Sequence, residues 1–147
     1  MIGKFPVKLS NCTRSALLIT AILSPQAFAE GIALIAHPDN KLQNVSSDEV
    51  KRLFLAKTDA IQGIKLKPVI QATSQSIRMV FDEDALGKSP PKSKAYWSRL
   101  IFTAAGSPPP SMESSEEIIQ WVASHPDAIS YIDIKAVTDE IKLLKTL

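Results

Sequence analysis

The sequence has few of the residues that build common cofactor and metal sites: one cysteine, two histidines and five glycines in 147 residues. A lone cysteine forms no disulfide within the chain, and His37 and His125 are too few for a tetrahedral metal site. The glycines are isolated from one another, which excludes a glycine-rich phosphate loop and a dinucleotide-binding turn. We therefore expect neither a metal nor a cofactor.

The sequence also lacks the patterns that are typical of catalytic sites. No Gly-x-Ser-x-Gly elbow is present to hold a serine nucleophile. Two acidic clusters, Asp82-Glu83-Asp84 and Glu116-Glu117, are candidate acid/base groups, but charged residues usually lie exposed, so solvated helix faces are the favoured interpretation. The sequence predicts a protein that is not an enzyme.

No apolar run is long enough to cross a bilayer, which takes roughly 20 residues. The longest run, residues 16–23, follows three cations, Lys4, Lys8 and Arg14, and precedes the small-x-small pattern Ala27-Phe28-Ala29. This order is typical of a secretory signal, whereas the alternative, a membrane anchor, needs a longer run. We expect residues 1–29 to be a signal peptide cleaved near Ala29, which removes Cys12 and leaves a periplasmic product.

The mature chain, residues 30–147, is nearly neutral. Loss of three of the 17 basic residues leaves 14 against 15 acidic ones, a net charge of −1. No basic run interleaved with aromatic residues remains, so nucleic acid is not an expected partner. The length fits one domain with one core. No second long apolar run is present, so a membrane span is not expected in the mature chain.

Hydrophobic periodicity over residues 30–147 predicts strands that alternate with helices, the pattern of a layered α/β domain. The expected strands cover residues 32–36, 64–70 and 128–134, with one more at 141–144. Four helices are expected. The first runs from a capping box at Ser46 and Glu49 to Lys57, and the second from Ser74 or Ser76 to Gly87. The third runs from Ser89 to Gly106, and the fourth from a second capping box at Ser114 and Glu117 to Pro126.

Apolar spacing within these helices predicts which side chains face the core. In the second helix the inward residues are expected to be Ile77, Val80, Phe81 and Leu86. In the third they are Trp97, Leu100, Ile101 and Ala104, the strongest amphipathic stripe in the chain. Trp121 lies off the apolar stripe of the fourth helix and is expected at the surface.

Three segments together resemble phosphate-type ABC transporter substrate-binding proteins, in particular small single-lobe members. Residues 47–57 are similar to the family segment S-x-x-E-V/L-x-x-I-F-x-G-K, and residues 128–132 are similar to its G-A-I-G-Y-V strand. Residues 87–110 resemble the linker and Tyr-Trp helix of the small members. The resemblance covers residues 31–145. It implies one lobe of a type II periplasmic-binding-protein fold, which is a central mixed sheet flanked by helices. Full-length members of the family have two such lobes, which close over an oxyanion.

The resemblance also implies a binding site at the start of the second helix. Thr73-Ser74-Gln75-Ser76 matches the family turn G-S-G-T, where backbone N–H groups and hydroxyls hold phosphate. Both family glycines are absent, but Arg78 offers a bidentate grip, and an arginine near a helix N-terminus is itself unfavourable without a nearby anion. We expect Thr73, Ser74, Gln75, Ser76 and Arg78 to bind phosphate or a related oxyanion.

Two other interpretations of this segment remain open. Ser74 or Ser76 can serve only as a helix cap, with Arg78 extending into water. The domain can also be a ligand-free interaction module of the cell envelope that docks on another envelope protein or on itself. In the second case the surface that faces the other lobe in relatives is expected to be an exposed patch.

Overall fold

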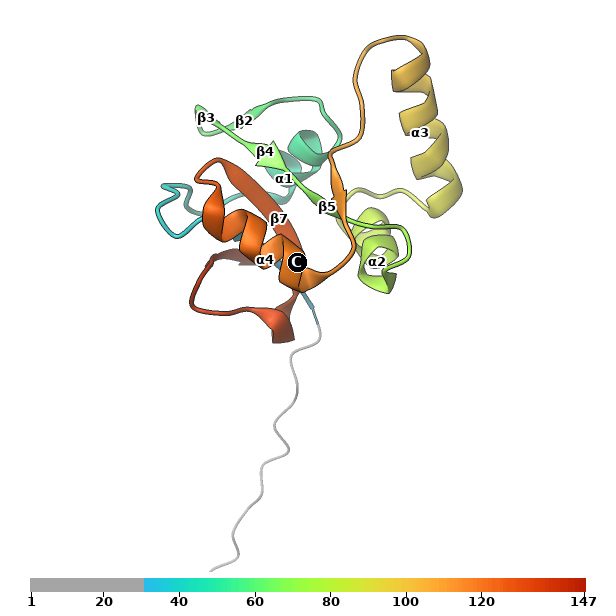
Figure 1. Cartoon of the computed structure of the whole chain (residues 1–147). Helices are drawn as coiled ribbons and strands as arrows, with labels where there is room; N and C mark the ends of the chain where they lie inside the picture. Colours follow the sequence, from blue (N-terminus) through green and yellow to red (C-terminus); the bar gives the residue numbers. More distant parts are fainter. Residues whose placement is uncertain (1–30) are drawn as a thin grey trace, which may run out of the picture.

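The computed structural model describes residues 31–147, and the predicted signal peptide lies outside this range. The central sheet has the strand order β4-β7-β1-β8 (Figure 1). Its strands are β1 (Ile32–Ala36), β4 (Lys67–Pro68), β7 (Ala128–Asp133) and β8 (Lys142–Thr146). The helices are α1 (Ser47–Phe54), α2 (Ser76–Asp84), α3 (Pro90–Phe102) and α4 (Ser115–Ser124), with a 3-10 turn η1 (Ile134–Ala136). β1 is antiparallel to both β7 and β8, whereas β4 is parallel to β7, so the sheet is mixed as predicted.

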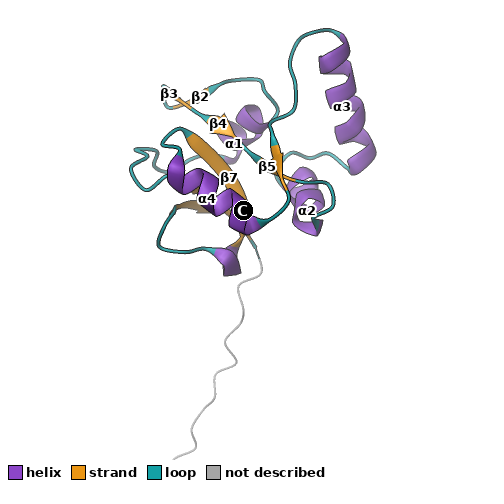
Figure 2. Ribbon diagram, viewed as in Figure 1, coloured by secondary structure: helices purple, strands orange, loops and turns teal. Residues whose placement is uncertain are grey.

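Helices cover both faces of this sheet (Figure 2). On one face, Leu34 belongs to a hydrophobic cluster with Phe54 of α1 and Phe81 of α2. On the other face, Ile35 belongs to a second cluster with Ile118 of α4. Because neighbouring residues of a strand point to opposite faces, a strand covered on both sides is apolar throughout. This explains the continuous apolar run of β1.

The predicted capping box at α1 is complete, whereas at α4 only its Ser114 half forms, because the Glu117 carboxylate accepts the Glu113 N–H (3.0 Å) instead. At α1, the Glu49 N–H donates to Ser46 Oγ (3.2 Å) and the Ser46 N–H donates to the Glu49 carboxylate (2.8 Å). At α4, the Glu117 N–H donates to Ser114 Oγ (3.2 Å). α1 ends at Phe54, three residues earlier than predicted, because the chain turns to enter the hairpin formed by β2 (Ala60–Ile61) and β3 (Ile64–Lys65).

The predicted single strand over residues 64–70 is wrong. The segment divides into three short strands: β3 (Ile64–Lys65), which pairs with β2 (Ala60–Ile61); β4, which pairs with β7; and β5 (Ile70–Gln71), which pairs with β6 (Ser111–Met112). Pro68 has no N–H to donate, so the ladder with β7 stays short and the chain passes on to a new partner.

The predictions for α2 are wrong in two respects. Its N-cap is Gln75, whose side chain makes no capping hydrogen bond, rather than Ser74 or Ser76. Val80 is 41% exposed, whereas Arg78 and Asp82 are buried. The inward face of α2 thus contains an ion pair, and Asp82 does not belong to the solvated acidic face that the sequence predicts.

The predicted stripe of α3 is confirmed at Trp97, which is buried, and at Leu100, which is partly buried and packs against the same core cluster, but not beyond them. Ile101 is 57% exposed, Phe102 is 91% exposed, and Ala104 lies beyond the helix end. α3 packs against α2, and the Tyr96 hydroxyl donates to the Leu55 carbonyl oxygen (2.7 Å). The last turn lies at the edge of the molecule (Figure 1), and within residues 31–147 its apolar side chains Ile101 and Phe102 remain exposed.

Within residues 31–147, no helix has both the length and the apolar character needed to cross a bilayer. Trp121 is partly exposed and stacks on His125, with ring centroids 3.7 Å apart, which agrees with the predicted surface position.

Candidate functional site

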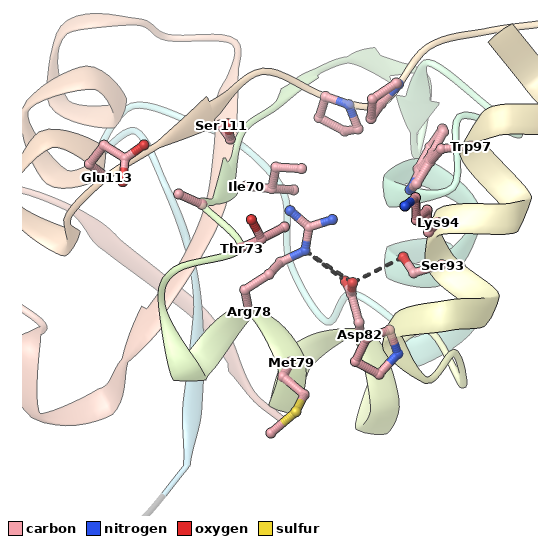
Figure 3. A pocket seen from close by; sticks show the side chains of 14 residues that line it. Ile70, Thr73, Arg78, Met79, Asp82, Ser93, Lys94, Trp97, Ser111 and Glu113 are labelled. Carbon is pink, nitrogen blue, oxygen red and sulfur yellow. Dashed lines mark hydrogen bonds and ion pairs between the residues drawn. The ribbon is translucent and has the colours of Figure 1, made fainter.

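A cavity of about 570 Å³ lies beside the N-terminal half of α2 (Figure 3). Its walls come from β5 and the turn after it, from α2, from the first half of α3, and from the segment 108–113. The polar lining residues are Thr73, Arg78, Asp82, Ser93, Lys94, Ser111 and Glu113. The apolar lining residues are Ile70, Ala72, Met79, Pro90, Trp97, Pro108 and Pro109.

Arg78 is the buried cation of this cavity, with 8% of its surface exposed. Its Nε donates to both carboxylate oxygens of Asp82 (3.0 and 3.1 Å), and its Nη1 donates to the Gln71 carbonyl oxygen (2.9 Å). The Ser93 hydroxyl donates to Asp82 Oδ2 (3.0 Å) and links the ion pair to α3. Figure 3 shows the outer edge of the guanidinium pointing into the cavity.

The sequence places this pair by helical spacing, because residues four apart lie on the same face of a helix. A cation in the first turn of a helix is unfavourable next to the positive end of the helix dipole, and Asp82 offsets that cost for Arg78. Within residues 31–147, Nη2 of Arg78 has no hydrogen-bond partner. The guanidinium is therefore fixed in orientation and keeps N–H groups that can donate to an anion in the cavity.

The structure brings together only two of the five residues that the sequence places in the site. Thr73 and Arg78 line the cavity, whereas Ser74, Gln75 and Ser76 do not. Ser74 Oγ donates to the Glu113 carboxylate (3.1 Å) and Gln75 Nε2 donates to the Glu113 carbonyl oxygen (2.6 Å). Ser76 is the exposed first residue of α2. The turn before α2 is therefore tied to the segment that precedes α4.

Several polar residues of the cavity were not among the predicted site residues: Asp82, Ser93, Lys94, Ser111 and Glu113. The four-residue spacing between Arg78 and Asp82 is a sequence signal for an ion pair. Because two more acidic residues follow Asp82, the cluster was instead interpreted as a solvated helix face. Ser93 and Lys94 had no sequence signal, because their position depends on how α3 packs against α2. The cavity thus contains two cations and two carboxylates.

Tyr131 supports the site from behind. Its hydroxyl accepts the Gln71 N–H (3.3 Å), and its ring stacks on Phe81 with centroids 3.7 Å apart. Burial raises the pKa of Tyr131 well above its usual value of 10, although the nearby Arg78 charge acts in the opposite direction. The phenol stays neutral and holds β5, and with it the carbonyl group that receives Arg78, against β7.

This fold is similar to one lobe of a type II periplasmic binding protein, and the solved structures that resemble it include phosphate-transport receptors. No protein-family model matches the chain, and no curated protein matches it. An ABC-type phosphate transport receptor from Vibrio cholerae matches with a TM-score of 0.61 and 16% sequence identity, over 79% of this chain and 46% of that one.

Two further structures agree. A protein from Clostridium perfringens, assigned as a phosphate ABC transporter substrate-binding protein and solved with bound phosphate, matches with a TM-score of 0.61 and 20% identity, over 79% of this chain and 44% of that one. PstS from Borrelia burgdorferi matches with a TM-score of 0.59 and 13% identity, over 78% of this chain and 46% of that one. The chain spans less than half the length of these receptors. The resemblance read from the sequence is confirmed at the level of the fold.

Proposed function

We propose that this protein is a secreted periplasmic solute-binding protein with a single lobe, and that it binds phosphate or a related oxyanion in the cavity beside α2. The observation that carries this proposal is the buried Arg78 guanidinium, oriented by Asp82 and by the Gln71 carbonyl group, with donors left over on the cavity side. A pre-oriented guanidinium binds an oxyanion without the loss of side-chain freedom that a surface arginine undergoes.

Two further groups extend this site. The Thr73 hydroxyl and the Lys94 ammonium group belong to the lining, and both residues are exposed, so a ligand in the cavity can reach them. The solved receptors with this fold are about twice as long, and one of them has phosphate bound. A second copy of the chain or an envelope partner can therefore complete the half-open site and shield it from water.

Calorimetric titration of residues 30–147 with phosphate, sulfate and molybdate tests the proposal. We expect saturable binding of at least one anion and a matching rise in melting temperature. Arg78→Lys keeps the charge beside Asp82 but loses the planar fork, so it should weaken binding by at least about tenfold.

Two lysines of α3 provide a matched comparison for the same titration. Lys94 lines the cavity and Lys92 does not, and both are exposed. Lys94→Ala should weaken anion binding, whereas Lys92→Ala should leave it unchanged. If none of the three anions binds, inorganic oxyanions are excluded as ligands. If the Arg78→Lys and Lys94→Ala variants both bind as the wild type does, this cavity is excluded as the site.

The secreted location rests on the predicted signal peptide, residues 1–29. Expression of the full chain in a Gram-negative host should give a periplasmic protein whose intact mass corresponds to a start at Glu30. A full-length product that stays in the cytoplasm would contradict export.

A second candidate function is that of an interaction module, and the exposed end of α3 favours it. Ile101 and Phe102 form an apolar tip, and residues 85–112 contain four cations and no acidic residue. Phe102→Ser should abolish self-association or capture of an envelope partner, measured by sedimentation velocity and by cross-linking in the periplasm. A wild-type protein that sediments as a monomer and captures no partner would argue against this function.

A further inference from the structure

We propose that the cavity is built for a singly charged organic oxyanion with an apolar substituent, such as a sulfonate or a phosphodiester, rather than for a free inorganic dianion. This inference rests on the proposed function, since it takes Arg78 as the group that binds the charged end. It adds the chemical class of the ligand, which follows from the size, the walls and the charge of the cavity.

The size of the cavity exceeds what an inorganic oxyanion fills. Its volume of about 570 Å³ lies within the range of about 300–1,000 Å³ that is typical of pockets for ligands of drug size. A tetrahedral inorganic anion has only a few heavy atoms, and one water takes up about 30 Å³ of liquid. An anion held at Arg78 therefore leaves most of the cavity to a further group of the ligand or to solvent.

The walls away from Arg78 are apolar. Trp97 from α3 and the rings of Pro108 and Pro109 form one side, and Ile70 and Met79 contribute to the others. In Figure 3 the Trp97 side chain points from α3 toward the cavity, and that of Ile70 points into it from β5. Aromatic and proline rings bury apolar surface without loss of side-chain freedom, so they favour an aryl or alkyl group over water.

The charges in the cavity oppose a doubly charged ligand. Arg78 and Lys94 supply two positive charges, and Asp82 and Glu113 supply two negative ones. Asp82 is buried against Arg78, so a bound anion meets a guanidinium whose charge is already balanced. A sulfonate or a phosphodiester needs one charge-assisted contact at Nη2, whereas a dianion also meets the repulsion of two carboxylates.

Three sulfur oxyanions test this inference by calorimetry on residues 30–147. Methanesulfonate and benzenesulfonate have the same charge and differ in apolar area, and sulfate has a second charge. We expect benzenesulfonate to bind at least about tenfold more tightly than methanesulfonate, because the ring buries apolar surface against Trp97 and the prolines. Sulfate should bind more weakly than benzenesulfonate.

A pair of neighbouring residues on α2 gives a matched control. Met79 lines the cavity and is 48% exposed, and Val80 is exposed but outside the lining, so neither change removes a core residue. Met79→Ser should lower the affinity for benzenesulfonate several-fold and leave that for methanesulfonate unchanged. Val80→Ser should change neither affinity.

The outcomes separate the two proposals. If methanesulfonate or sulfate binds as tightly as benzenesulfonate, the organic-ligand inference is overturned and oxyanion binding stands. If Met79→Ser affects both sulfonates equally, the apolar contact is likewise refuted. If phosphate, sulfate, molybdate and both sulfonates all fail to bind, the proposed function and the inference fall together.

Discussion

Arg78 is held by Asp82 and by the Gln71 carbonyl oxygen, and the contribution of the Asp82 ion pair can be measured. Removal of one member of a buried ion pair leaves the other charge without compensation, which typically costs about 3–5 kcal/mol. Asp82→Ala should therefore lower the free energy of unfolding by about that amount, measured by urea denaturation. The change also removes the acceptor of the Ser93 hydroxyl.

Asp84, on the same helix, is the matched control, because it is exposed and has no resolved partner in residues 31–147. Asp84→Ala should alter the free energy of unfolding by less than about 0.5 kcal/mol. The double change Arg78→Met with Asp82→Leu should recover much of the loss, since it removes both buried charges. Equal effects of Asp82→Ala and Asp84→Ala would show that the pair is not buried in solution.

The sequence singles out Arg78 but does not show its environment. Arg78 was identified because a cation at a helix N-terminus requires a nearby anion. From the sequence, this anion was expected to be a bound oxyanion. In the structure it is Asp82, one turn further along α2. The spacing was visible, but helical spacing alone does not distinguish an inward face from a solvated one when both carry charges.

At the scale of elements, the helix starts differ in how much their caps contribute. Ser46 accepts the Glu49 N–H at the start of α1, whereas Ser89 at the start of α3 makes no side-chain capping hydrogen bond. Ser46→Ala should lower the free energy of unfolding by about 1 kcal/mol, and Ser89→Ala by no more than a few tenths. Thermal and urea unfolding of the two variants gives this comparison, and equal losses would contradict the assigned caps.

Elements with two agreeing signals were predicted well. β1 has an apolar run bounded by turn residues, β7 follows Pro126 and alternates with period two, and α1 and α4 have a cap followed by apolar spacing. The segment 64–70 had a strand pattern, but its division into β3, β4 and β5 depends on three different partners. α3 had the clearest stripe, yet Ile101 and Phe102 in its last turn are exposed. Periodicity shows that a face is apolar and does not show that another element covers it.

At the scale of the whole molecule, the alternation of strands and helices was enough to predict the layered fold. The cavity was not predictable in the same way. Its walls come from β5, α2, α3 and the segment 108–113, which meet only in the folded chain. Thr73 and Arg78 both line the cavity because they flank one helix start, whereas Lys94 and Trp97 reach it through the packing of α3.

Tyr131 connects the core of the whole molecule, and its ionisation should limit stability at high pH. Its ring contacts Phe81 and Phe54, so it joins β7 to α2 and α1. Burial raises the pKa of Tyr131 in the folded state above 10, while the unfolded chain releases that proton near pH 10. The folded state then binds one proton more than the unfolded state. The stabilisation is complete below pH 10 and declines as the pH rises beyond it.

Tyr131→Phe removes this proton and keeps the ring. The free energy of unfolding of the wild type should therefore fall more steeply above about pH 10, by about 1.4 kcal/mol per pH unit relative to Tyr131→Phe. Urea unfolding from about pH 9 to about pH 11 measures these slopes. Parallel slopes for the wild type and Tyr131→Phe would show that the phenol is accessible to solvent, and that the core behind the cavity is looser than its ring contacts indicate.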